Sequence, residues 1–429
     1  MRKFLATHSE FLGNVALIMS GRTIAAIIAL FTMPIVSRLF APADFGVAAI
    51  FVSICSTISP LASLRYEAAF VLPKERDQAT LLMACAYRVA ILTCVLLTVG
   101  VAAYEIFGLR FETLHLLGQW RWALPLGVLL MTIIHLQESW LTREKHFKLV
   151  STSLVAGNVV TSLSRIIFGA AVGTSIYGLI IGYIIGLLSR IGIMHESARE
   201  GWRALFAKWS RADMWNTMRR YSDFPRLNAP AALVFAAGQN LPVMVFGALF
   251  SPAVAGLYAM ANRLAQVPVA IVANSLRRVF LQKAAAIANE GRSLRRAFLL
   301  ASAGLALMGV LPLLVLSFAG QPILTWLLGA NWTDAGSFLE IMAPWLFMAW
   351  VEAPCNPVFV VLRRQKFWLA LQTSLTLLRL GAFAVAYWMT STPAETLRAF
   401  VIATVIGSLV TIATAYALIG RANPNYSAS

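Results

Sequence analysis

Charged side chains are scarce in this sequence. Only 12% of its 429 residues are Asp, Glu, Lys or Arg, whereas 59% are hydrophobic. Soluble proteins carry about 25% charged residues, so the composition excludes an ordinary soluble domain and indicates a chain that lies mostly in a lipid bilayer. Acidic residues are rarer than basic ones, 18 against 35, so the formal net charge is +17.

Other absences narrow the function. No Gly-rich phosphate loop, nucleophile elbow, zinc motif or dinucleotide fingerprint occurs in the sequence. We therefore expect no catalytic residues, no metal site and no cofactor. Cysteines are few and have no paired spacing, which predicts buried free thiols rather than disulfides. They are Cys55, Cys85, Cys94 and Cys355.

Long apolar runs make up most of the chain. A run of about 20 residues is long enough to cross the ~30 Å hydrocarbon layer as a helix. The sequence predicts about twelve such helices, near residues 12–38, 45–64, 79–103, 122–141, 149–172, 175–194, 227–249, 254–275, 297–318, 338–361, 368–389 and 398–419.

Basic residues are distributed unevenly between the loops. If the N-terminus is cytoplasmic, only Arg110, Arg121 and Arg398 lie in outside loops. This follows the positive-inside rule and predicts that both termini are cytoplasmic. The net charge therefore indicates topology, and we expect no nucleic-acid partner.

A repeated turn divides the chain into two halves. Residues 39–47 and 249–257 match at Leu39/Leu249, Phe40/Phe250, Pro42/Pro252, Ala43/Ala253 and Gly46/Gly256. Six predicted spans separate the copies, so the halves should insert the same way up, with a binding site at their interface. We expect an N-terminal six-helix lobe (1–194), a cytoplasmic linker (195–223) and a C-terminal six-helix lobe (224–429).

The predicted linker is both aromatic and basic. Trp202, Trp209 and Trp215 lie among arginines and lysines, a mixture that suits an anionic inner leaflet. A helix that binds a protein partner is the alternative interpretation.

Several arginines fall inside the predicted spans. An arginine at the bilayer centre costs about 2.5–3.5 kcal/mol on insertion scales, and few carboxylates are available in the spans to pair with these residues. The surplus of positive charge indicates that the protein interior attracts anions. The arginines are Arg22, Arg88, Arg165, Arg226, Arg263 and Arg379; the carboxylates are Glu138, Glu340 and Glu352.

Two of these arginines are the strongest candidates for ligand binding. Arg22 and Arg263 lie within the predicted first and eighth spans, and a guanidinium group can grip phosphate oxygens with two hydrogen bonds. Asn240, Asn262 and Gln266 could bind sugar hydroxyls or hold helices together. His135 and Glu138 could form a proton relay or a simple polar pair.

The order and spacing of these residues resemble those of a known family. The stretches that carry the resemblance include Ser37-Arg38-Leu39-Phe40-Ala41-Pro42-Ala43-Asp44-Phe45-Gly46, Leu64-Arg65-Tyr66-Glu67 through Lys74, Tyr221-Ser222-Asp223-Phe224-Pro225 and Ala255-Gly256-Leu257 through Arg263. They resemble the Wzx-type flippases of lipid-linked oligosaccharides, in the MATE-like (MOP) superfamily.

The resemblance implies a fold and a substrate. The fold is an all-α membrane protein of two homologous six-helix lobes around a central cationic cavity. The substrate is undecaprenyl diphosphate carrying a short oligosaccharide for O-antigen, capsule or exopolysaccharide synthesis. Family cavity residues map onto Arg22, Arg65, Glu67, Arg263, Arg38 and Arg226. Polysaccharide polymerase and chain-length proteins are the partners that the family implies.

The mechanism expected from these charges is alternating access across the bacterial inner membrane. The return of an empty cationic cavity calls for a coupling ion, H⁺ or Na⁺, which the sequence does not identify. One alternative is a membrane-embedded polymerase or ligase that acts on the same lipid. Another is a secondary transporter of small solutes.

Overall fold

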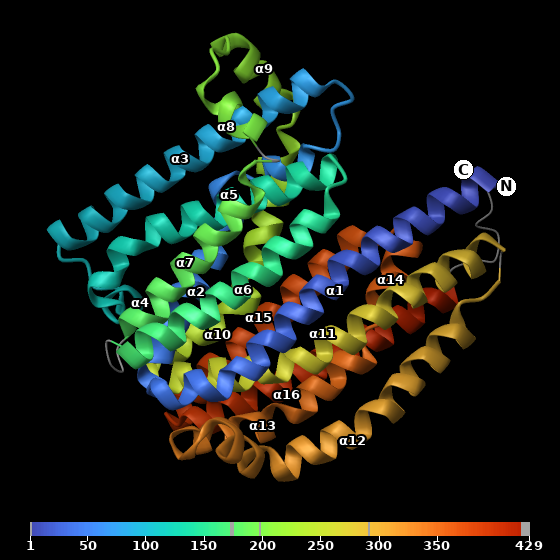
Figure 1. Ribbon diagram of the computed structural model, residues 1–429. Helices are drawn as coiled ribbons and strands as arrows, with labels where there is room; N and C mark the ends of the chain where they lie inside the picture. The colour runs from blue at the N-terminus through green and yellow to red at the C-terminus, as the bar shows by residue number, and fades with distance from the viewer. Residues whose placement is uncertain (1, 172–175, 197–198, 291, 422–429) are drawn as a thin grey trace. The chain divides into compact units, whose positions relative to one another are not determined.

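The structure, a computed structural model, describes residues 2–171, 176–196, 199–290 and 292–421. Every regular element in these ranges is helical (Figure 1). Eleven of the described helical segments are long and apolar enough to cross a membrane. The predicted fold class, an all-α integral membrane protein, is therefore confirmed. The chain folds as two compact units, residues 1–256 and 257–429, which we describe one at a time.

The first unit contains ten α-helices that lie wholly within it and three short turns of 3-10 or π-helix. Its α-helices are α1 (Arg2–Leu39), α2 (Pro42–Ala62), α3 (Arg76–Ile106), α4 (Glu112–His115), α5 (Leu124–Arg143), α6 (Phe147–Ala171), α7 (Ile176–His195), α8 (Arg199–Phe206), α9 (Arg211–Arg220) and α10 (Ala229–Leu249). Its turns are η1 (Tyr66–Ala69), η2 (Gly118–Ala123) and η3 (Phe224–Asn228).

Helix α2 is central to the packing of this unit. It contacts α5, α7 and α10, and its side chains Ile50 and Phe51 are fully buried. The helix begins at Pro42, where the missing N–H costs nothing because the first turn has no hydrogen-bond acceptor for it. Pro60 lies near its other end, close to the turn that leads into η1.

A second core forms where α3, α5 and η1 meet. Phe70, Tyr87 and Trp140 are each at most 1% exposed there, and the rings of Phe70 and Trp140 pack edge to face. The segment between α7 and α10 covers this core, because Trp202 and Phe224 pack against it. Figure 1 shows α8 and α9 beside the first half of α3.

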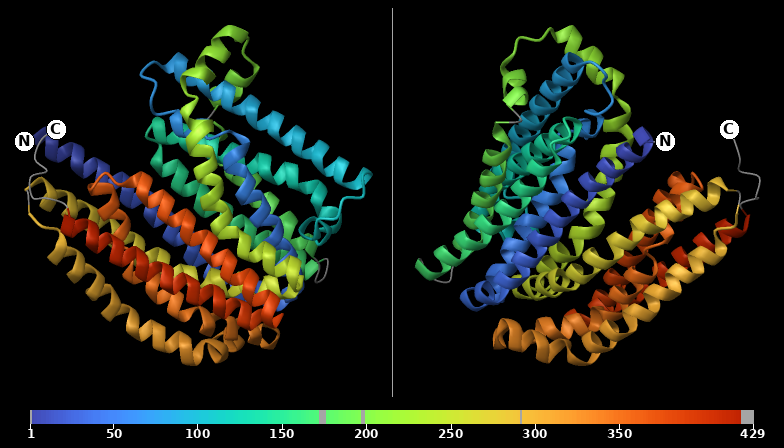
Figure 2. Two further views of the ribbon diagram at one scale, coloured as in Figure 1. Left: turned by 180° about the vertical axis from the view of Figure 1, so that it is seen from behind. Right: turned by 45° about the vertical axis from the view of Figure 1, so that its right-hand side comes forward.

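The second unit is a smaller helical bundle. Helix α12 packs along α13, while α16 contacts α13, α14 and α15; Figure 2 gives two further views of these orange and red helices. Phe280, Phe298 and Phe359 are buried in one of its cores. The elements are α11 (Pro252–Asn289, which begins in the first unit), α12 (Arg295–Leu328), η4 (Ala330–Trp332), α13 (Thr333–Val351), α14 (Cys355–Val361), α15 (Gln365–Thr390) and α16 (Pro393–Arg421).

One predicted segment differs in detail from the structure, and one is not tested by it. The predicted outside loop 319–337 is helical as far as Leu328, because α12 continues through Pro312 and Pro322; prolines are tolerated in membrane helices, where neighbouring groups satisfy the freed backbone. The predicted span 254–275 falls on α11, and its residues 268–275 lie outside the residues whose side chains the structure describes, so this span stays a prediction. The other eleven predicted spans each coincide with one of the eleven candidate spans.

Candidate functional site

The turn after α2 carries two of the predicted site residues. Leu64 and Arg65 both have left-handed backbones, with φ values of 51° and 61°, a conformation that costs roughly 1–2 kcal/mol for residues other than glycine. Side-chain contacts hold the turn in place. Ser63 Oγ donates a 2.6 Å hydrogen bond to Glu67, and Arg65 Nη1 lies 3.2 Å from Glu67 Oε1. Arg65 and Glu67 thus form an ion pair.

Neighbouring helices fasten the rest of this segment. Arg143 Nη1 donates hydrogen bonds of 2.6 and 2.7 Å to the carbonyl oxygens of Phe70 and Pro73. The Tyr66 hydroxyl donates to the carbonyl of Met218 at 3.3 Å. Burial raises the pKa of Tyr66, and Cys85 adds to the effect, so this hydroxyl keeps its proton and remains a donor at neutral pH.

A second ion pair joins α5 to α7. Arg190 Nη2 contacts Glu138 Oε1, so Glu138 pairs with an arginine rather than with His135, one turn away. His135 lies close enough to both ion pairs to interact electrostatically with Glu138, Glu67, Arg65 and Arg190. The same end of the unit therefore holds two carboxylates, two guanidinium groups and an imidazole.

Arg226 belongs to the same end of this unit. It lies in the π-helical turn η3, which packs against η1, and its side chain is exposed. The structure therefore brings together the segments that carry Arg65, Glu67 and Arg226.

The two predicted residues on α1 are far apart. Gly21 packs so closely on α6 that a Cβ there would lie 1.9 Å from Ser151 Oγ, and Arg22 is exposed beside this contact. Arg38, in the last turn of α1, is also exposed. Because a helix rises 1.5 Å per residue, their Cα atoms are about 24 Å apart. A single diphosphate cannot reach both.

The predicted amide side chains make local hydrogen bonds. Asn240 Nδ2 donates to the carbonyl of Ala236 at 2.8 Å, one turn back on α10. On α11, in the second unit, Gln266 Nε2 donates to Asn262 Oδ1 at 3.3 Å. Each amide keeps further hydrogen-bonding capacity. Arg263, between Asn262 and Gln266 in sequence, is exposed.

Three other arginines of the spans have partners within the protein. Arg88 Nη2 donates to the carbonyls of Leu205 and Ala207 at 3.1 and 3.0 Å. Arg165 Nε donates to the carbonyl of Leu179 at 3.3 Å, and Arg379 interacts electrostatically with Glu352.

The remaining three arginines of the spans differ from these in their exposure and in their ion pairing. Arg22, Arg226 and Arg263 are exposed, and among the ion pairs of the described residues none includes them. A guanidinium that is not neutralised by a carboxylate can bind a phosphate without losing a partner. This is the property expected of a site for an anionic ligand.

The four cysteines are free and buried, in agreement with the sequence analysis. In the ranges that the structure describes, no three His, Cys, Asp or Glu side chains come together as metal ligands.

Sequence reasoning missed two features of this region. The first is the ion pair of Arg190 with Glu138. The signal for it in the sequence is the position of Arg190 inside the predicted run 175–194. The second feature is Gln137. It is fully buried, and neither its amide nitrogen nor its oxygen has a hydrogen-bond partner in the part of the protein described. Nothing in the sequence distinguishes it from a paired glutamine.

Comparison with solved structures identifies the fold. The lipid II flippase MurJ, in an inward closed conformation, aligns with a TM-score of 0.73 at 13% identity, over 95% of this chain and 90% of that one. A multidrug resistance MATE family transporter of the MOP superfamily, inward-facing, aligns at 0.64 with 14% identity, over 95% and 96%. The MATE multidrug transporter DinF-BH also gives 0.64 and 14%, over 98% and 97%.

Sequence comparison gives the family. A search of curated proteins finds no match. The family model described as "Polysaccharide biosynthesis protein" matches residues 35–337. This range includes every predicted site residue except Arg22. Because the match covers well over half of the chain, and because the fold is that of the MurJ and MATE transporters, the chain belongs to the polysaccharide biosynthesis protein family.

Proposed function

We propose that the protein is a flippase that moves an undecaprenyl-diphosphate-linked oligosaccharide from the inner to the outer leaflet of the bacterial inner membrane. The product would serve O-antigen, capsule or exopolysaccharide synthesis. The observation that carries this proposal is that Arg22 and Arg263 are each exposed on a helix of a membrane protein and have no carboxylate partner in the described ranges.

The chemistry of the diphosphate fits these residues. Removing an arginine from water inside a membrane protein is costly, and a phosphate that accepts two hydrogen bonds from the guanidinium offsets that cost. In this proposal Arg22 and Arg263 each contact the diphosphate during the transport cycle. Asn240, Asn262 and Gln266 use their remaining hydrogen-bonding groups on the sugars.

The charges at the end of the first unit have a different role in the proposal. Arg65 is already paired with Glu67, so it can release that carboxylate and take a phosphate only if the ion pair rearranges. Arg226 is exposed nearby. We assign these three residues to substrate capture at the cytoplasmic face, with both termini on that side. We assign Arg38, in the last turn of α1, to the later, outward-facing stage.

The membrane potential can drive the loaded step. A diphosphate carries about two negative charges, and each charge gains about 2.3 kcal/mol per 100 mV when it leaves a negative interior. The gain is therefore roughly 4–5 kcal/mol per 100 mV. The empty, positively charged protein must then return against the same potential, which is the step at which H⁺ or Na⁺ would couple. Polymerase and chain-length proteins would receive the product on the outer side.

The test is a leaflet assay in proteoliposomes that contain undecaprenyl diphosphate linked to a labelled oligosaccharide. We expect wild-type protein to expose the label to an external glycosidase. Arg22→Ala and Arg263→Ala should lower the initial rate at least tenfold while the melting temperature is unchanged. Arg110→Ala is the matched control, because Arg110 is an exposed arginine in a predicted outside loop, and it should transport normally.

Depletion of the protein in its host gives an independent readout. Accumulation of the lipid-linked oligosaccharide on the inner leaflet, rescued by wild type but not by Arg22→Ala, supports a flippase. Accumulation on the outer leaflet would instead indicate a polymerase or ligase. If no lipid-linked intermediate accumulates, the remaining function is transport of a small solute, and the proposal is wrong.

A further inference from the structure

Helix α8 has two faces of different chemistry. Arg199, Trp202, Arg203 and Phe206 recur at the spacing i, i+3, i+4, i+7, so they share one side of the helix. The opposite side is buried against α3, where a Cβ on Gly201 would lie only 1.9 Å from Met83 Cε. The half-buried Trp202 lies between the two sides and also packs on α3.

The helix is fixed in this orientation by contacts with α3. Arg88 donates hydrogen bonds to the carbonyls of Leu205 and Ala207, at the C-terminal end of α8. A cation is favourable at this end because the helix leaves carbonyl groups there without partners. The rings of Tyr87 and Trp202 also pack with centroids 5.5 Å apart. The contacts with α3 therefore determine which side of α8 faces outward, so this helix is not part of a loose linker.

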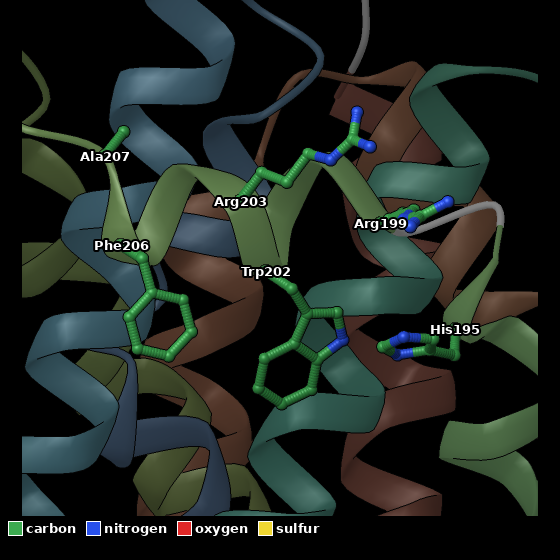
Figure 3. A pocket seen from close by; sticks show the side chains of 6 residues that line it. All are labelled: His195, Arg199, Trp202, Arg203, Phe206 and Ala207. Carbon is green, nitrogen blue, oxygen red and sulfur yellow. The ribbon is translucent and has the colours of Figure 1, made fainter.

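A pocket of about 460 Å³ opens along this outward face, lined by His195, Arg199, Trp202, Arg203, Phe206 and Ala207. Figure 3 shows the ring of Phe206 beside that of Trp202, with His195 facing Trp202 and both guanidinium groups at the opposite edge of the pocket from the Phe206 ring. No carboxylate is among the lining residues that the structure describes. The pocket thus offers positive charge on one side and aromatic surface on the other.

The position of the pocket in the chain places it at the edge of a membrane span. His195 is the last residue of the candidate span Ile176–His195, and α8 begins four residues later. Phe206 is 81% exposed, which is unfavourable in water and favourable at the boundary between head groups and acyl chains. Arginines flanking an exposed aromatic ring are typical of helices that lie at this boundary. Glu196 is exposed nearby but does not line the pocket.

We propose that this pocket binds the phosphate-bearing head group of an anionic glycerophospholipid of the cytoplasmic leaflet. Arg199 and Arg203 contact the phosphate, His195 lies at the edge of the head group, and Phe206 reaches the upper part of the acyl chains. The site concerns a lipid of the surrounding bilayer rather than a transported one, so it does not depend on the proposed function. The transport assay and the lipid assay can fail separately.

The first experiment measures thermal stabilisation of the detergent-solubilised full-length protein by phosphatidylglycerol. Phosphatidylcholine and inorganic phosphate are tested in parallel. We expect phosphatidylglycerol alone to raise the melting temperature. The double variant Arg199→Gln/Arg203→Gln should need roughly 10- to 30-fold more of this lipid for the same rise, since each basic residue near an anionic lipid contributes about 1 kcal/mol. Arg219→Gln/Arg220→Gln removes the same charge from exposed positions on α9 and should behave as wild type.

Three results of this experiment would overturn the proposal. An equal effect of phosphatidylcholine would show that the head group is not recognised. Stabilisation by inorganic phosphate alone would make the pocket a free-phosphate site. An equal loss of stabilisation in the α9 double variant would mean that binding of the lipid depends only on the total charge of the protein.

A second measurement tests depth without relying on stability. Phe206→Cys is labelled with an environment-sensitive fluorophore in nanodiscs that contain phosphatidylglycerol brominated on its acyl chains. We expect strong quenching at this position and weak quenching at Ala212→Cys, an exposed site on α9. Equal quenching at both positions would place α8 and α9 at the same depth and contradict the assignment of Phe206.

Discussion

Gly46 and Gly256 meet backbone to backbone, and the contact is reciprocal. A Cβ on Gly46 would lie 1.6 Å from the carbonyl oxygen of Pro252, and a Cβ on Gly256 would lie 1.9 Å from that of Pro42. The same two glycines and two prolines form the repeat seen in the sequence, and each proline begins a helix, α2 or α11. The contact therefore joins equivalent positions of the repeated turn.

The first prediction concerns these glycines. We expect Gly46→Ala and Gly256→Ala each to lower the stability by at least about 1–3 kcal/mol, because the added methyl group meets backbone that cannot rotate away. Thermal unfolding in detergent measures the effect. Gly100→Ala is the control, since a Cβ there meets nothing within 4 Å and alanine is the better helix former. A loss of stability as large in the control would show that the clash is not the cause.

The second prediction concerns Arg88. In Arg88→Gln the carbonyls of Leu205 and Ala207 lose a charged donor, a change worth about 1.5–3 kcal/mol. We expect α8 to detach more often from α3, so trypsin should cut at Arg203 and Lys208 at least tenfold faster. Limited proteolysis of the folded protein measures this rate. Arg220→Gln, an exposed change on α9, should leave the rate at those two bonds unchanged, and similar rates in both variants would contradict the capping role.

The third prediction concerns Gln137, a buried amide with no hydrogen-bond partner in the described ranges. Gln137→Met keeps the shape and removes both polar groups, so we expect a gain in stability of about 1–3 kcal/mol. Gln137→Glu should have the opposite effect because it buries a charge. Melting temperatures of the two variants are the measurement. A destabilised Gln137→Met would mean that the amide has a partner, such as bound water.

The fourth prediction separates Arg22 from Arg38. Their separation of about 24 Å along α1 means that a small diphosphate can contact only one of them. We expect Arg22→Ala to weaken binding of farnesyl diphosphate roughly 10- to 100-fold, the loss of one charge-assisted contact of about 1.5–3 kcal/mol. Arg38→Ala should change it less than twofold. Calorimetric titration in detergent gives both affinities, and equal losses would contradict this assignment.

The fifth prediction concerns the ion pair between Glu138 and Arg190. Both side chains are partly exposed, at 31% and 16%, so we expect a coupling energy of only about 1 kcal/mol. A double-mutant cycle with Glu138→Gln, Arg190→Gln and the double variant measures it by thermal unfolding. A coupling near zero would show that the two charges act independently.

The sequence was sufficient for the large features of the fold. Apolar runs located the spans because only a helix of about 20 residues satisfies its backbone inside a bilayer, and the Pro42/Pro252 repeat located two equivalent turns. Pairing could not be predicted in the same way. Glu138 lies three residues from His135 on one helix, and nothing local indicates that its partner is Arg190, on a helix much later in the chain. Likewise, the carbonyl partners of Arg88 come from a linker that the sequence placed at the membrane surface.

The left-handed pair Leu64 and Arg65 has a consequence for engineering. Glycine or asparagine adopts this conformation at lower cost, so a thermostability screen over these two positions should enrich them. At position 64 the substitution that gives this stability removes only an aliphatic side chain. At position 65 it removes the guanidinium that pairs with Glu67, so variants selected for heat resistance alone would lose whatever activity depends on that group. Directed evolution of this protein would therefore need to select for transport and thermal resistance together.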